Sequence, residues 1–167
     1  MARYKREIKK TLLVVGEGDS EKAFLQHLRS LYCTRGDGVK VTIRNAHGKG
    51  PDNVVNFAIR QLNVCSYDAC VVVLDTDIPW TELLKKKAKK ANIELVGSSP
   101  CLEGFLLLIL GTCPPEQSVQ CKKDIKRFLG IDLTEWESYT SSFPKTLLED
   151  ARLKIPQLDR LLRYYEG

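Results

Sequence analysis

The chain has 167 residues, of which 43% are hydrophobic and 28% are charged. This composition is typical of a single soluble globular domain and excludes a largely disordered chain. The formal net charge of +5 favours a polyanionic partner without requiring one. The longest apolar run, Phe105 to Leu110, is too short to cross a bilayer, so we expect no membrane partner.

The cysteine and histidine content argues against a zinc protein. None of the six cysteines belongs to a Cys-x-x-Cys pair, and the chain has two histidines. Structural zinc sites need closely spaced ligands of these types. No signal peptide precedes the first predicted strand, and we expect a cytoplasmic protein with reduced thiols.

The first 110 residues alternate between short apolar runs, typical of strands, and segments with apolar residues at helical spacing. We predict strands over 8 and 11–15, 39–44, 71–74 and 93–96, and helices over 20–32, 52–62, 78–91 and 101–110. Asp19 and Asp52 are expected to cap the first two helices, and Pro79 to lie in the first turn of the third. This order predicts an α/β, Rossmann-like fold with a mostly parallel four-stranded sheet and helices on both faces.

The rest of the chain is predicted to be mainly helical. We expect helices over 116–129 and 143–167, the second interrupted at Pro156, and a loop over 132–142. Residues 1–112 would form the core that carries the site, and residues 113–167 a helical extension packed on it. The run of lysines over 85–90 is typical of a solvated helix face, and Lys122, Lys123, Lys126 and Arg127 make a second basic surface.

Two carboxylates follow the most apolar strand. Val71 to Leu74 leads directly into Asp75-Thr76-Asp77. In an open α/β sheet, ligands bind beyond the carboxyl ends of the strands. Two acids placed there repel each other unless a cation such as Mg²⁺ lies between them. The alternative is structural, because aspartate at a strand end also forms turns and caps helices.

Further acids are predicted at the same edge. Glu17, between Gly16 and Gly18, follows the first strand, and Glu21 falls in the first turn of the next helix. If the first and third strands are parallel neighbours, these acids meet Asp75; otherwise Glu17 is a solvated turn residue and Glu21 a favourable charge at a helix start.

Two later segments add candidates. In the loop over 45–51, Lys49 lies between two glycines and would present its amine to a phosphate, and His47 is predicted to be an ordinary loop residue. Glu103, near the start of the apolar helix, is either a partner of the helix dipole or a further acid of the site. Gly104 costs about 1 kcal/mol inside a helix relative to alanine, so a close backbone approach is expected there.

These segments, in this order, resemble one known group. Leu12 to Glu21 is similar to the first motif of the Toprim (topoisomerase–primase) domain, and more narrowly to its Glu-Gly-x-Ser/Thr-Glu form in OLD-family nucleases and RloB-like proteins. Asp75-Thr76-Asp77 matches the Toprim Asp-x-Asp after the third strand. Ser99 to Leu108 resembles the RloB-like segment Asn/Ser-Pro-Cys-aromatic-Glu-Leu-Trp-Leu-Leu, and Gly48-Lys49-Gly50 recurs in related groups.

The chain departs from this pattern in two ways. Leu102 and Phe105 replace the bulkier aromatic residues expected around Glu103. The chain is also short for the group and has no recognisable ATPase domain. The resemblance therefore implies a Toprim-like fold whose ATPase or sensor, where one is needed, is a separate subunit. Whether the chain forms a homodimer is left open.

The resemblance implies a nuclease that cleaves phosphodiesters with Mg²⁺ or Mn²⁺. Asp75 and Asp77 would bind metal, Glu17 would bind metal or act as general acid/base, and Glu21 would complete a second metal site. Glu103 is a fifth candidate ligand. Lys49, or alternatively Lys145, would stabilise charge developing on the phosphoryl group. Without metal the acids should repel, which raises the pKa of at least one of them.

Nucleic acid, either DNA or RNA including tRNA, is the expected partner, with the basic helices as contacts. Defence against phage or mobile DNA is implied by the resemblance alone. One alternative is a catalytically silent Toprim-like module that binds nucleic acid or a partner ATPase. Another is a phosphotransferase with Asp75 as nucleophile, which would instead place the Asp-x-Asp after the first strand.

Overall fold

The computed structural model describes residues 9–34 and 38–167. Its sheet has four strands in the order β2-β1-β3-β4, and every neighbouring pair is parallel. The strands are β1 (Lys10–Gly16), β2 (Val39–Asn45), β3 (Ala69–Asp75) and β4 (Ile93–Ser98). The predicted α/β fold is confirmed, with a sheet that is entirely parallel; Ile8 of the first predicted strand lies outside the described residues.

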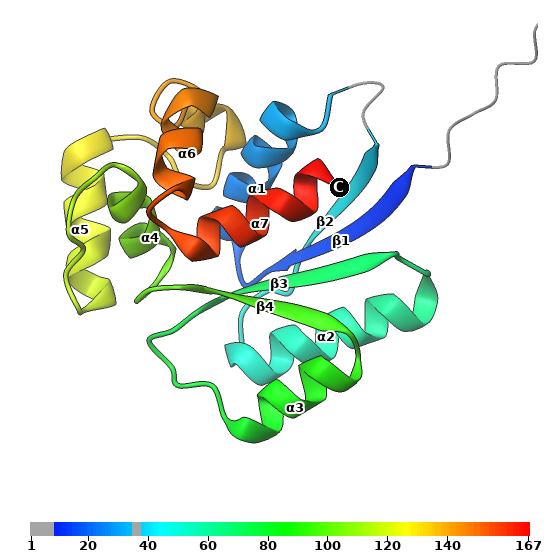
Figure 1. Cartoon of the computed structure of the whole chain (residues 1–167). Helices are drawn as coiled ribbons and strands as arrows, with labels where there is room; N and C mark the ends of the chain where they lie inside the picture. The colour runs from blue at the N-terminus through cyan, green and yellow to red at the C-terminus, as the bar shows by residue number, and fades with distance from the viewer. Residues whose placement is uncertain (1–8, 35–37) are drawn as a thin grey trace, which may run out of the picture.

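Helices cover both faces of the sheet (Figure 1). They are α1 (Asp19–Tyr32), α2 (Gly50–Val64), α3 (Glu82–Lys90), α4 (Leu102–Ile109), α5 (Ser118–Leu129), α6 (Lys145–Arg152) and α7 (Pro156–Glu166), with a short 3₁₀ helix at Trp136–Tyr139. Helices α2 and α3 pack on one face, and α1 and α7 pack on the other. None of the helices in the described residues has the length and apolar character needed to cross a membrane.

The central strands are apolar throughout because both of their faces are buried. On β1, Leu12 and Val14 join the core beneath α1 and α7, whereas Leu13 and Val15 join the core above α2 and α3. The edge strand β2 alternates between buried and solvent-facing residues, as its sequence predicts.

Three helix starts differ from the prediction. Helix α1 is capped by Gly18, whose N–H donates to the Glu21 carboxylate at 3.0 Å, so Asp19 is left to accept a hydrogen bond from Asn45 at 2.6 Å. Helix α2 begins at Gly50, upstream of Asp52. Helix α3 begins at Glu82 and is capped by the Thr81 hydroxyl, so Pro79 precedes it.

The C-terminal segment completes the core of one face. The buried side chains of Tyr139, Phe143, Leu148 and Leu162 lie in the same apolar cluster as Phe24 of α1. Residues 132–142, predicted to be a loop, contain the 3₁₀ helix, whose Tyr139 packs against Phe24 with ring centroids 5.6 Å apart. The predicted break near Pro156 is confirmed, because α7 begins at this residue.

Gly104 of α4 is held in a close approach, as its position inside a helix predicts. A Cβ atom on Gly104 would lie 2.6 Å from Pro100 Cδ, 2.7 Å from the Ser99 carbonyl oxygen and 3.2 Å from Cys121 Sγ. Glycine therefore lets α4 begin directly against the end of β4 and against α5. This contact fixes where Glu103, the preceding residue, stands.

The substitution Gly104→Ala should destabilise the fold. We expect a loss of about 1–3 kcal/mol in the free energy of unfolding, because the added methyl group overpacks a backbone contact. Urea denaturation monitored by circular dichroism measures it. Gly38→Ala is the control, since a Cβ there meets no atom of the described residues within 4 Å, and it should stay within about 0.5 kcal/mol of the parent. Equal stability of the two variants would contradict the packing argument.

Candidate functional site

The parallel pairing of β1 with β3 brings the predicted acids together. Val15 of β1 is in register with Val72 of β3, so Glu17 and Asp75 leave neighbouring strands at the same edge. Glu21 reaches this edge from the first turn of α1, and Glu103 from the first turn of α4. The sheet order confirms the condition on which the prediction of a shared acidic edge depended.

Asp75 lies at the centre of these acids. Burial raises the pKa of its carboxyl to about 8, with further contributions from the negative charges of Glu21, Glu17, Asp77 and Glu103. Its Oδ1 atom is buried and has no hydrogen-bond partner in the described residues. Burying a carboxylate oxygen without a hydrogen-bond donor costs free energy. A bound proton or cation would remove this cost.

Glu17 and Glu21 share this environment. Burial raises the pKa of Glu17, a hydrogen bond from the Asp75 main chain opposes the rise, and the charge of Asp77 adds to it. Burial also raises the pKa of Glu21, and the charges of Glu103 and Glu17 raise it further. The Gly18 N–H donates to Glu21 Oε2 at 3.0 Å, so Glu21 caps α1 and belongs to the acid group at the same time.

Asp77 is the exposed member of the group. Its Oδ1 atom accepts the Ile78 N–H at 2.8 Å, and its Oδ2 atom accepts the Ser118 hydroxyl at 2.9 Å. Ser118 is the first residue of α5. No local sequence pattern predicts this contact, because 41 residues separate the two partners.

Hydrogen bonds tie the loops of the site to one another. The N–H groups of Thr76 and Asp77 donate to the Pro100 carbonyl at 3.1 and 2.9 Å, which joins the end of β3 to the start of α4. The Gly48 N–H donates to the Glu17 carbonyl at 2.7 Å, which joins the loop before α2 to the loop after β1. The acids therefore stand on connected backbone at the sheet edge.

The two candidate lysines differ in their placement. Lys49 precedes α2 with a left-handed backbone (φ 71°), next to the glycine bound to Glu17, and its exposed side chain forms no ion pair within the described residues. Lys145 places its amine 4.8 Å from the centre of the Tyr32 ring, at the last residue of α1. Glu21 lies in the first turn of that helix, about 16 Å away at 1.5 Å per residue, so Lys145 does not join the site. His47 is exposed.

The five acids supply the type of ligand that a hard divalent cation prefers. Mg²⁺ and Mn²⁺ prefer carboxylate oxygens, and none of the ion pairs in the described residues involves the five acids. Within 9–34 and 38–167, no three Asp, Glu, His or Cys side chains already form a metal-binding group. Hydrogen bonds to Gly18, Ile78 and Ser118 hold Glu21 and Asp77 instead, so binding a metal would require these side chains to reorient.

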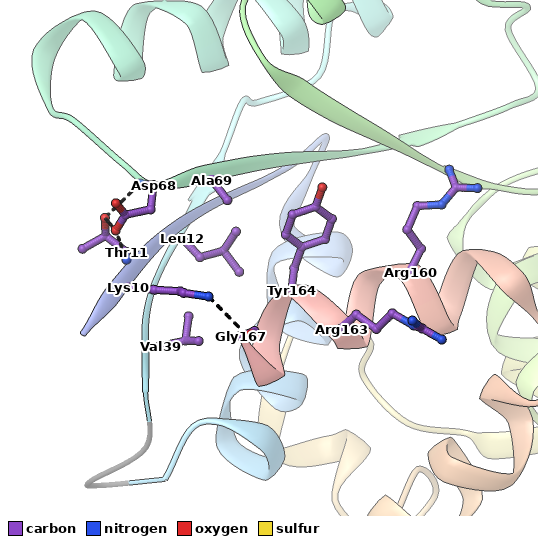
Figure 2. A pocket seen from close by; sticks show the side chains of 10 residues that line it. All are labelled: Lys10, Thr11, Leu12, Val39, Asp68, Ala69, Arg160, Arg163, Tyr164 and Gly167. Carbon is purple, nitrogen blue, oxygen red and sulfur yellow. Dashed lines mark hydrogen bonds between the residues drawn. The ribbon is translucent and has the colours of Figure 1, made fainter. Parts of the chain in front are cut away.

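A cavity of about 520 Å³ lies at the opposite edge of the sheet (Figure 2). Its walls come from the first residues of β1, β2 and β3 and from α7. Its two arginines are already paired, Arg160 with Glu94 at 3.1 Å and Arg163 with Asp159 at 2.8 Å. This cavity is remote from the acid group, and the carboxylates of Glu94 and Asp159 neutralise the charge of its two arginines.

These features define an α/β protein with a group of carboxylates at the carboxyl edge of a parallel sheet. The family model described as RloB-like protein matches residues 12–157. The chain belongs to the RloB-like family. Comparisons with curated proteins and with solved structures found no match.

The raised pKa values predict how stability changes with pH in metal-free protein. The folded state holds the Asp75 proton with a pKa of about 8, against an ordinary aspartate pKa of 3.8. The resulting stabilisation is complete below the unfolded pKa and is lost as pH rises through the folded pKa. We therefore expect the free energy of unfolding of the parent, relative to Asp75→Asn, to fall by about 1–2 kcal/mol between pH 5 and pH 8.5.

Urea denaturation in EDTA at both pH values provides the measurement. Asp150→Asn, a change at an exposed acid of α6, is the control and should follow the parent at both pH values. A constant difference between the parent and Asp75→Asn across this range would show that Asp75 titrates normally and that the acids do not interact.

Proposed function

We propose that the chain is a Mg²⁺- or Mn²⁺-dependent nuclease with a Toprim-like core, related to the OLD-like nucleases, that cleaves phosphodiester bonds of DNA or RNA in the cytoplasm. The observation that carries the proposal is the buried oxygen of Asp75, with four other carboxylates around it. Within residues 9–34 and 38–167 this oxygen has no hydrogen-bond partner, and no cationic side chain is paired with any of the five acids. A fold gains nothing from collecting these charges, whereas a cation site requires them.

The residues divide into ligands and groups that act on the substrate. Asp75, Asp77, Glu17 and Glu21 would hold the metal, with Glu103 as a further ligand. A bound divalent cation neutralises charge on the phosphoryl group and activates water as a nucleophile.

The chain's own contribution to the reaction comes from two loops. Glu17, on the loop after β1, would either bind the metal or act as general acid/base, and the raised pKa of its partly buried carboxylate suits it to accept the proton of the attacking water. Lys49, on the neighbouring loop, would stabilise the charge that develops on the phosphoryl oxygens. The hydrogen bond between Gly48 and Glu17 keeps these loops adjacent.

Membership of the RloB-like family supports a role in defence against phage or mobile DNA, which we include in the proposal. A separate ATPase or sensor subunit would then control cleavage. A second reading is a catalytically silent module that binds nucleic acid or such an ATPase. The hydrogen bonds that hold Glu21 and Asp77 without metal favour this reading.

Cleavage of labelled single-stranded DNA, duplex DNA and tRNA tests the activity. We expect products with Mg²⁺ or Mn²⁺ and none with EDTA, and at least 100-fold slower cleavage by Asp75→Asn, because the central ligand is lost. Asp150→Asn should cleave like the parent. Cleavage that survives both EDTA and Asp75→Asn would overturn the metal-dependent mechanism.

Thermal unfolding tests metal binding separately from activity. A ligand that binds only the folded state stabilises it by about 2.7 kcal/mol at 100 times its dissociation constant. We therefore expect Mn²⁺ to raise the midpoint temperature of the parent and of Asp150→Asn by several degrees, and to leave Asp75→Asn unchanged. A parent that shows neither a Mn²⁺ shift nor cleavage would establish the silent-module reading.

A further inference from the structure

A second cavity, of about 370 Å³, opens beside the acid group. Glu103 forms one wall, the start of α1 contributes Ser20, and α5 contributes Lys122 and Lys126. The segment after α5, including Asp132, closes the far side. The cavity therefore begins at a member of the acid group and runs outward between α5 and the segment that follows it.

The cavity carries two lysines without carboxylate partners. Lys122 and Lys126 are four residues apart on α5, which places them on the same side of the helix. Both are exposed, and neither forms an ion pair within the part of the chain that the structure describes. Although Glu103 and Asp132 line the same cavity, neither is ion-paired with these lysines, so both ammonium groups are open to an anion.

Asp132, the other acid of the cavity wall, is engaged locally. Its Oδ1 atom accepts the Thr134 N–H at 2.9 Å and the Thr134 hydroxyl at 2.6 Å. These hydrogen bonds lower the pKa of its carboxyl, so Asp132 stays charged and would repel an anion from its own side of the cavity.

The lysine-rich helix α3 offers a contrast. Its last turn carries Lys89 and Lys90, and β4 begins three residues later at Ile93. Because the acids stand where the strands end, these lysines lie at the opposite edge of the sheet. A substrate phosphate bound near the acids would contact the lysines of α5 and would leave those of α3 free.

We propose that this cavity binds a phosphate of the nucleic-acid strand next to the scissile one, through Lys122 and Lys126. The inference rests on the proposed nuclease function and adds to it the path of the substrate, from the acid group outward along α5. A polyanionic strand is repelled by five carboxylates, so cationic contacts beside them provide attraction where the acids do not.

The double variant Lys122→Gln/Lys126→Gln tests the proposal, with Lys89→Gln/Lys90→Gln as a control of equal charge. We expect the α5 variant to cleave an oligonucleotide of the preferred class with about tenfold lower kcat/KM, and to reduce the slope of log(kcat/KM) against log[salt] by about 2. Hydrolysis of bis(p-nitrophenyl) phosphate, which has no flanking phosphate, and the Mn²⁺ shift in midpoint temperature should both be unchanged.

Other outcomes separate the two proposals. Equal oligonucleotide cleavage by the α5 and α3 variants would overturn the phosphate subsite and leave the nuclease intact. A matching loss on bis(p-nitrophenyl) phosphate would also overturn it, because the lysines would then act at the reaction centre or on the fold.

If the parent cleaves neither substrate, the nuclease proposal fails and oligonucleotide binding by fluorescence anisotropy decides the subsite. Weaker binding by the α5 variant alone supports the phosphate site, and equal binding by both variants overturns it. Lys122→Arg/Lys126→Arg retains both charges and should restore whichever signal the glutamine variant loses.

Discussion

Negative charge is concentrated at the carboxyl edge of the sheet, and the loops and helix starts around this edge are built to accommodate it. Four acids approach the half-buried carboxylate of Asp75, and within the described residues no lysine or arginine is paired with any of the five. The fold tolerates this arrangement by burying Asp75, which raises its pKa into the neutral range, and by giving Glu21 and Asp77 hydrogen bonds from neighbouring groups.

Glycine allows two helices to start against this edge. A Cβ atom on Gly16 would lie 2.8 Å from Glu21 Cβ, so α1 can start close to β1 only if that residue has no side chain. Gly104 has the same role at α4, where Pro100 and Ser99 occupy the space of a side chain. The positions of Glu21 and Glu103, and hence the electrostatics of the site, follow from these two close approaches.

The C-terminal segment forms part of the site as well as of the core. Ser118 of α5 donates to Asp77, and Tyr139 of the 3₁₀ helix stands close enough to Glu21 and Glu103 for their charges to add to the rise that burial causes in its pKa. Tyr139 also donates to the Leu133 carbonyl at 2.9 Å. The acid group therefore has walls from both parts of the chain.

Much of this organisation is predictable from sequence, because it depends on local patterns. Continuous apolar runs predict strands buried on both faces, and their alternation with amphipathic segments predicts a parallel sheet. Acids directly after two of these runs predict the acidic edge, and Gly104 inside an apolar helix predicts a close approach. The helix starts are less predictable from sequence. Gly18 caps α1 in place of the neighbouring Asp19, and Thr81 caps α3, so that Pro79 precedes this helix.

The class of fold, the identity of the five candidate acids and the polar character of the sheet edge are predictable from the sequence alone, since each depends on residues close together in the chain. The tertiary structure pairs β1 with β3, which makes the acids one group. It also places Ser118 against Asp77 and Lys145 beside Tyr32 at the far end of α1. Glu103 and the lysines of α5 line one cavity. These relations join segments distant in sequence, and packing, which no local pattern encodes, sets the distances between them.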